Sequence, residues 1–185
     1  VHQEDMENHG VHIEYGASQF KVMGLPVQEY PVQPPILQQS LLRIPRSTLS
    51  ELIQKTVFAV GENDARYILN GVLLELRSSA LGGVGEHRHF LRLVGTDGHR
   101  LALAEREFES QPSSASGGPG SGPVDPVSVI IPKKTLVEVK RLLEEEEQDP
   151  EVGFAKNQML FRQGSLLLLS RLMEGTFPNY QQVIP

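Results

Sequence analysis

Polar and apolar residues alternate near the start of the chain, on both sides of Gly16. Such alternation is typical of strands with one apolar face, and a glycine between two alternating runs indicates a turn. We therefore predict a β-hairpin over residues 11–24. Residues 25–40 are rich in proline and have no regular period, so we expect an extended connector there.

Two segments have the apolar period of about 3.6 residues that is typical of amphipathic helices. The first follows Pro45 and ends near Gly61, and the second covers about 133–147. Thr48 and Glu51 have the spacing of a capping box, in which two side chains bond the free N–H groups of the first turn. We therefore expect a side-chain cap on the first helix.

Residues 42–45 precede the first helix, and strands are expected between and after the helices, so that the order β-α-β-β-β occurs twice. They are predicted at about 65–76, 89–95, 100–105, 127–131, 152–155, 158–163 and 165–172. Residues 44–52 and 131–139 share the pattern Ile-Pro-basic-x-Thr-Leu-x-Glu-apolar, which supports an internal duplication. Residues 109–126 are largely Ser, Gly and Pro and indicate a flexible surface loop. The sequence thus predicts an α+β fold with two helices packed on antiparallel sheets.

Composition narrows the classes of function. The 185 residues are 39% hydrophobic and 22% charged, as in ordinary globular proteins, and the absence of cysteine excludes disulfides and thiol nucleophiles. The net charge of −6 argues against a surface that binds nucleic acid everywhere, but it leaves room for a local basic face. With neither a signal peptide nor an apolar run long enough for a membrane span, a cytoplasmic protein is the simplest interpretation.

One side of the second predicted helix is basic. Its cationic residues fall in one sector of the helical wheel, opposite the apolar side that must pack on a sheet. They are Lys133, Lys134, Lys140 and Arg141. From the residues alone, a solvated face is the simpler interpretation. The alternative is a surface that follows phosphates, because Lys and Arg contact the DNA backbone without reading its sequence.

A tight turn at 96–101, Thr-Asp-Gly-His-Arg-Leu, carries the other candidate chemistry. An enzyme could use His99 as a base oriented by Asp97, and His87 and His89 could bind a metal. The sequence has no P-loop, no nucleophile elbow and no spacing typical of paired catalytic carboxylates. The residues alone favour a binding or scaffold protein. A small metal- or acid/base-dependent hydrolase that uses these residues is the alternative.

Four stretches of the chain resemble the bacterial β sliding clamp family, the DNA polymerase III beta subunits that act as processivity factors. They are Ala-Arg-Tyr-Ile-Leu-Asn-Gly at 65–71, Thr-Asp-Gly-His-Arg-Leu-Ala at 96–102, Ile-Pro-Lys-Lys at 131–134 and Gly-Thr-Phe-Pro-Asn-Tyr at 175–180. The resemblance implies the DNA clamp fold. In this family two subunits close into a ring around duplex DNA, with helices lining the hole and sheets forming the outer wall.

The resemblance also implies a domain organisation. Residues 41–183 would form a complete middle domain, and residues 1–25 would be the closing strands of a truncated first domain. The connector would cover 26–40, the segment 109–126 would be an inserted loop, and 184–185 would begin a third domain. The full-length protein would be a ring-shaped homodimer, and we expect this chain alone to be a monomer.

Finally, the resemblance assigns roles to residues. In the family, a hydrophobic cleft on the middle domain binds a short peptide motif carried by the polymerase, the clamp loader and repair proteins. The cleft wall carries over onto Leu69, Thr96, Gly98, His99, Arg100, Leu101 and Pro185, and Leu69 is expected to be partly exposed. The residues that would face DNA are Lys133, Lys134, Lys140 and Arg141, with Arg66 and Tyr67 at the rim. The family is not enzymatic, and we expect no cofactor and no metal.

Overall fold

The computed structural model describes residues 2–5, 10–29, 41–62, 64–80, 87–109, 126–155 and 157–184. The chain divides into two compact units, 1–37 and 38–185. The smaller unit contains an antiparallel sheet in the order β1-β2-β3, followed by a 3₁₀ turn. Its elements are β1 (His2–Asp5), β2 (Gly10–Tyr15), β3 (Ser18–Met23) and η1 (Val27–Glu29). The turn at Gly16, with φ 58°, confirms the predicted hairpin. Most of the predicted connector, residues 30–40, lies outside the described residues.

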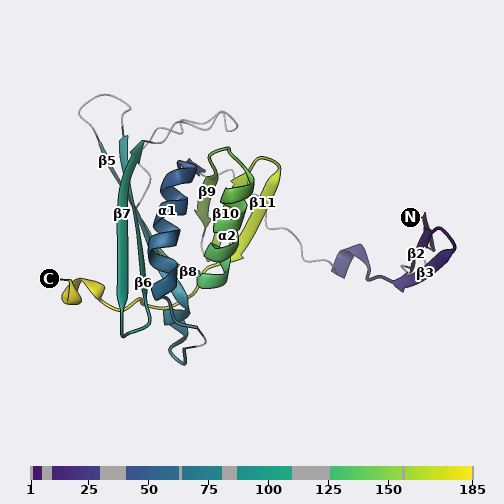
Figure 1. Ribbon diagram of the computed structural model, residues 1–185, viewed down its shortest axis with the longest axis horizontal. Coiled ribbons are helices and arrows are strands. Elements are labelled where there is room, and N and C mark those ends of the chain that lie inside the picture. Colours follow the sequence, from purple (N-terminus) through teal and green to yellow (C-terminus); the bar gives the residue numbers. More distant parts are fainter. Residues whose placement is uncertain are drawn as a thin grey trace. The chain divides into compact units, whose positions relative to one another are not determined.

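The described residues of the larger unit form two helices and two four-stranded antiparallel sheets (Figure 1). One sheet has the order β7-β6-β5-β8, with β5 (Gly71–Ala80), β6 (His87–Thr96), β7 (Leu101–Glu109) and β8 (Val127–Pro132). The other has the order β11-β10-β9-β4, with β4 (Leu42–Arg43), β9 (Glu151–Ala155), β10 (Gln158–Gln163) and β11 (Leu166–Arg171). The helices are α1 (Arg46–Thr56) and α2 (Lys133–Glu145), and the 3₁₀ turns are η2 (Val57–Ala59), η3 (Tyr67–Asn70) and η4 (Tyr180–Val183). Neither helix in this described part of the chain has the length and apolar character needed to cross a membrane.

The predicted duplication is confirmed, with an exchange of strands between its two copies. The first copy is β4-α1-β5-β6-β7 and the second is β8-α2-β9-β10-β11. The first strand of each copy pairs in the sheet of the other, since Leu42 on β4 lies opposite Val152 on β9, and Ile131 on β8 lies opposite Val72 on β5. The two copies therefore share both sheets and cannot separate without breaking each of them.

The start of α1 differs from the prediction. The helix begins at Arg46, whose backbone N–H donates to Oδ1 of Asp149 at 2.8 Å. Glu51 does not close a capping box with Thr48, because its carboxylate binds Arg106 on β7 instead. The predicted capping box is wrong, since an acceptor from a distant loop satisfies the first turn and Glu51 joins the helix to the sheet.

The predicted strand at 65–76 is also partly wrong. Residues 67–70 form η3, and β5 begins only at Gly71. The side chain of Asn70 accepts from the backbone N–H of Asp64 at 2.9 Å and donates to its carbonyl oxygen at 3.0 Å. These two bonds close 64–70 into a compact loop. The other strands in the larger unit are observed close to their predicted bounds, and 110–125 of the predicted loop lies outside the described residues.

Two apolar clusters pack on opposite faces of the sheet β7-β6-β5-β8. Successive side chains of a strand point to opposite faces, and on β5 Leu74 belongs to the larger cluster whereas Leu73 belongs to the smaller one. The larger cluster includes the apolar sides of α1 and α2. The smaller cluster consists of Leu73, Val94, Ile130, Met173 and Tyr180. One face of the sheet is thus covered by helix, and the other by the segment 174–183, which we call the strap.

Candidate functional site

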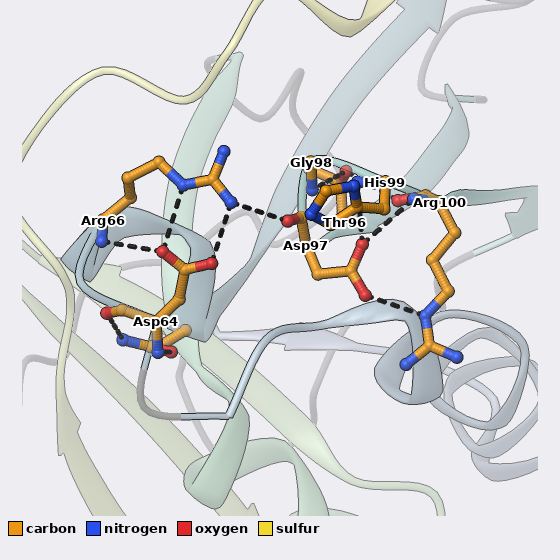
Figure 2. A network of polar contacts seen from close by, with 8 residues as sticks. Asp64, Arg66, Thr96, Asp97, Gly98, His99 and Arg100 are labelled. Carbon is orange, nitrogen blue, oxygen red and sulfur yellow. Dashed lines mark hydrogen bonds and ion pairs between the residues drawn. The ribbon is translucent and has the colours of Figure 1, made fainter.

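The turn between β6 and β7 is fixed by the side chain of Asp97 (Figure 2). Its Oδ1 accepts from the backbone N–H groups of His99 and Arg100, both at 3.0 Å, and its Oδ2 accepts from Nε of Arg100 at 2.9 Å. These donors, above all the backbone N–H of Arg100, lower the pKa of Asp97 to about 2. Thr96 also stabilises the turn, because its Oγ1 donates to the carbonyl of Arg100 at 2.7 Å and accepts from the N–H of Gly98 at 3.0 Å.

Arg66 joins this turn to the loop that precedes β5 (Figure 2). Its guanidinium binds both carboxylate oxygens of Asp64, at 3.0 and 2.8 Å, and donates to the carbonyl oxygen of Asp97 at 2.8 Å. The bonds from Arg66 lower the pKa of Asp64 to about 2. Gly98 makes room for the guanidinium, since a Cβ at this position would lie 2.6 Å from Nη1 of Arg66, and its φ of 85° suits glycine. The two loops therefore form one polar rim.

Beside this rim lies a groove of about 520 Å³. Its walls come from η3, the β6–β7 turn, the start of β7 and the strap. The lining residues are Arg66, Ile68, Leu69, Thr96, Gly98, His99, Arg100, Leu101, Pro178, Asn179, Tyr180 and Val183. Apolar side chains thus lie beside the backbone of an exposed turn, an arrangement that can hold the apolar side chains of an extended peptide.

The structure brings most of the predicted cleft residues together in this groove. Leu69, Thr96, Gly98, His99, Arg100 and Leu101 all line it, and Pro185 lies outside the described residues. Sequence reasoning did not assign Ile68, Pro178, Asn179, Tyr180 and Val183 to the cleft. The stretch 175–180, noticed only as a resemblance, was the available signal for three of them.

The expected exposure of Leu69 is wrong. Its side chain is 2% exposed and belongs to the interior, because η3 turns it inward. The main chain of this turn is bonded on both sides of the residue, with the Leu69 N–H donating to Arg66 O at 2.8 Å and the Leu69 carbonyl accepting from Gly61 N at 3.1 Å. Leu69 therefore shapes the floor of the groove. A ligand would meet the partly exposed Ile68, Leu101 and Val183.

The residues of the alternative enzymatic site do not come together. His89 lies near the start of the central strand β6, 4% exposed, with its Nδ1 2.8 Å from Oγ of Ser78. The rest of β6, roughly 20 Å at the usual rise per residue, separates it from the turn that carries Asp97 and His99. Asp97 bonds the backbone of His99, and the side chain of His87 lies outside the description. Among the described residues, no group of three or more His, Asp or Glu side chains could hold a metal.

Acidic partners accompany most of the basic positions on α2. The ion pairs are Lys133–Glu62 at 2.7 Å, Lys140–Glu144 at 3.9 Å, Arg141–Glu138 at 3.0 Å and Arg141–Glu145. Lys134 is exposed and forms no ion pair within the described part of the chain. Of the two predicted rim residues, Tyr67 is 64% exposed, whereas Arg66 is held by Asp64 and the turn. The helix face is thus basic at its start and nearly neutral at its end.

The duplicated unit, with two helices beside antiparallel sheets that share strands, has the fold of a DNA clamp domain. Residues 43–179 match the family described as DNA polymerase III beta subunit, central domain, and the chain belongs to this family. Among curated relatives, the beta sliding clamp of Caulobacter vibrioides is 35% identical over 173 residues, which cover 94% of this chain and 42% of that protein. The beta sliding clamp of Pseudomonas aeruginosa is 36% identical over 175 residues, covering 94% of this chain and 41% of that protein.

Solved structures give the same result. The DNA polymerase III subunit beta from Pseudomonas aeruginosa superposes with a TM-score of 0.76 at 30% identity, covering 98% of this chain and 44% of that one. The Caulobacter crescentus beta sliding clamp, with a TM-score of 0.71 at 34% identity over 94% of this chain and 42% of that one, was solved with polyethylene glycol bound to a region described as tethering the beta motif. This chain therefore spans about 42% of the length of relatives that are sliding clamps.

Proposed function

We propose that this chain supplies the middle domain of a sliding clamp, a non-enzymatic processivity factor that encircles duplex DNA and tethers the replicative polymerase. Membership of the family supports the proposal, and the groove is the observation that carries it. Residues 41–183 would be that domain, 1–25 the closing strands of a first domain and 184–185 the start of a third. The full-length protein would act in the cytoplasm as a ring-shaped homodimer, whereas this chain alone is expected to be a monomer, which size-exclusion chromatography with light scattering tests.

The groove would bind the short peptides through which the polymerase, the clamp loader and repair proteins attach. Its apolar residues Ile68, Leu101 and Val183 would take the aliphatic and aromatic side chains of such a peptide, each worth roughly 1.5–3 kcal/mol when fully buried. The exposed turn at His99 and Arg100 offers polar groups to the peptide backbone. We expect a dissociation constant in the micromolar range or weaker for a peptide with Gln followed by spaced Leu and Phe.

The basic face of α2 would contact duplex DNA without reading its sequence. Lys134 offers a charge with no ion-pair partner among the described residues, while Lys133 and Arg141 share theirs with acidic neighbours. Such contacts suit a protein that must slide, because sequence-independent contacts to phosphates are the same at every position along the duplex. A local face of this kind is also compatible with the net charge of −6.

A matched pair of valine substitutions tests the groove. Val183→Asp places a charge on an apolar groove residue that is 68% exposed, so the fold should tolerate it. Val137→Asp makes the same change on α2, at a residue that is 47% exposed and does not line the groove. We expect Val183→Asp to weaken peptide binding about tenfold or more, since a charge facing an apolar ligand is costly, and Val137→Asp to leave it unchanged. Circular dichroism checks folding, and a folded Val183→Asp variant with wild-type affinity would refute the site.

A further inference from the structure

The strap forms one wall of the groove, and few contacts hold it in place. At Met173, just before the strap, the chain is fixed to the sheet because its N–H donates to the carbonyl of Ile130 at 2.8 Å. The strap then turns at Gly175, with φ 137°, and its residues are mostly exposed up to Asn179. The partly buried Phe177 packs against the smaller apolar cluster, and Tyr180, which is 6% exposed, belongs to that cluster.

The hydroxyl of Tyr180 connects the strap to two charged side chains of the sheet. It donates to Oε2 of Glu75 on β5 at 2.6 Å and accepts from Nη1 of Arg92 on β6 at 3.0 Å. Arg92 is itself held by Glu105 on β7, with Nε 2.8 Å from Oε2. Within the described residues, the two bonds at this hydroxyl are the hydrogen bonds that join 174–184 to the rest of the unit.

The strap also has open space behind it. A second cavity of about 560 Å³ lies along the strap, and Pro178, Asn179 and Tyr180 line both this cavity and the groove. The strap packs closely on η3 at Gly175, where a Cβ would lie 3.0 Å from Cδ1 of Ile68. Farther along, at 178–180, it has empty volume on two sides, so close packing does not fix its position there. The directional hydrogen bonds of Tyr180 supply the constraint that packing leaves out.

We propose that Tyr180 is a positioning residue for the groove: its hydroxyl, clamped between Glu75 and Arg92, sets the place of the strap and so the width of the groove. The proposal rests on the proposed function of the groove as a peptide site. Tyr180 would act on the peptide through Pro178 and Val183, the strap residues that line the groove beside it. The shape of the groove would thus depend on the hydrogen bonds between the Tyr180 hydroxyl and the side chains of Glu75 and Arg92.

The test removes the hydroxyl and nothing else. Tyr180→Phe keeps the ring in the apolar cluster and leaves Glu75 paired with Arg77 and Arg92, at 3.5 and 3.6 Å. The probe is a fluorescein-labelled peptide with Gln followed by spaced Leu and Phe, titrated into the full chain. Loss of a typical hydrogen bond should weaken binding about three- to tenfold. A parallel NMR measurement follows the methyl signals of Val183, which should shift, and of the core residue Leu52, which should not.

Two controls separate positioning from general effects. Tyr15→Phe makes the same chemical change at an 85% exposed residue of the smaller unit, so neither peptide affinity nor the Val183 signals should change. Ser170→Ala removes a part-buried hydrogen bond, to Thr135 at 2.7 Å, which joins β11 of the other sheet to α2. It should lower the melting temperature by a similar amount and leave peptide affinity unchanged. Equal losses of affinity in Tyr180→Phe and Ser170→Ala would show a merely structural role and overturn the proposal.

The conservative variant Glu75→Gln sharpens the result. Its amide oxygen can still accept from the Tyr180 hydroxyl, so affinity should stay within about twofold of wild type, whereas Glu75→Ala should behave like Tyr180→Phe. Unchanged Val183 signals in Tyr180→Phe would refute the tether whether or not the peptide binds. A wild-type chain that fails to bind the peptide, with Val183 signals that do shift, would instead contradict the function proposed for the groove.

Discussion

The duplication places two hairpins at equivalent positions, and they differ in what surrounds them. The β10–β11 hairpin turns at Gly164, with φ 57°, and a Cβ there would have one neighbour at 4.0 Å, the side chain of Gln148. The β6–β7 hairpin turns at Gly98, where a Cβ would lie 2.6 Å from Arg66. The same hairpin is thus a plain connection in one copy and part of a built rim in the other. The difference lies in the loop 64–70 and the strap, which adjoin the β6–β7 turn and not the β10–β11 turn.

The largest expected effect is on the free energy of unfolding. It should distinguish the buried floor of the groove from the plain copy. Leu69→Asp buries a charge at a side chain that is 2% exposed, and we expect it to unfold the larger unit, at a cost of about 3 kcal/mol or more. Leu169→Asp, on β11 of the plain copy at 37% exposure, should cost roughly 1 kcal/mol or less. Urea denaturation followed by circular dichroism measures both. Equal stability of the two variants would show that Leu69 is accessible after all.

The next comparison uses the two glycines. Gly98→Ala and Gly164→Ala should each destabilise the chain by roughly 1 kcal/mol, because both positions have positive φ. Only Gly98→Ala should also displace the Arg66 guanidinium and weaken peptide binding, by about tenfold. Thermal unfolding and a peptide titration separate the two effects. If Gly164→Ala weakened peptide binding equally, the built rim would not be what distinguishes the copies.

A smaller effect should appear in the dependence on pH. The pKa of Asp97 is lowered to about 2 by the backbone and side-chain donors of the turn, against 3.8 ordinarily. A lowered folded-state pKa contributes stability that is fully present above the unfolded value and is lost as the pH falls from about 4 through 2. We expect Asp97→Asn to be less stable than wild type at pH 7, and this difference to shrink between pH 4 and pH 2. Urea denaturation at several pH values measures it, and a constant difference would contradict the bonding of the turn.

The smallest effect concerns the basic face of α2. For this chain alone, we expect duplex DNA to bind with a dissociation constant on the order of 10⁻⁴ M or weaker at physiological salt. Lys134→Glu on α2 should weaken this binding about threefold and reduce its dependence on salt. Lys21→Glu makes the same charge change in the smaller unit and should have less effect. Fluorescence anisotropy at low and high salt measures both, and equal effects would indicate that net charge, not the face of α2, attracts the DNA.

Local sequence patterns predicted much of the secondary structure, because helices and hairpins depend on residues that are close in the sequence. The apolar period gave both helices, and the repeated Ile-Pro-basic motif gave the duplication. Contacts between distant residues left no local signal. Asp149 caps α1 and β4 pairs with β9, and neither pairing follows from spacing. The local bond between Asn70 and Asp64 was missed for another reason, because residues 65–76 read as a strand.

The candidate groove likewise has parts that local sequence predicted and parts that depend on contacts between distant segments. The turn at 96–101 was recognisable from its residues, since Asp, Gly and Thr are typical of tight turns. Leu69 lines the groove, but its burial depends on η3, which the strand-like sequence concealed. Val183 and Ile68 became visible as wall residues only when the strap and the loop 64–70 were placed on the same side of the turn.

The exchange of β4 and β8 has a consequence for synthesis on the ribosome. The pairing of Leu42 with Val152 cannot form until Val152 has emerged, and β5 lacks its partner β8 until Val127–Pro132 has emerged. Non-local pairing of this kind slows folding, since a long loop must close before the contact stabilises it. The first copy therefore leaves the ribosome with one sheet edge uncovered and its first strand unpaired. Domain assembly should be a late, all-or-none event in translation, and ribosome-bound chains ending after Glu109 should be digested by protease where chains extended past Val183 resist it.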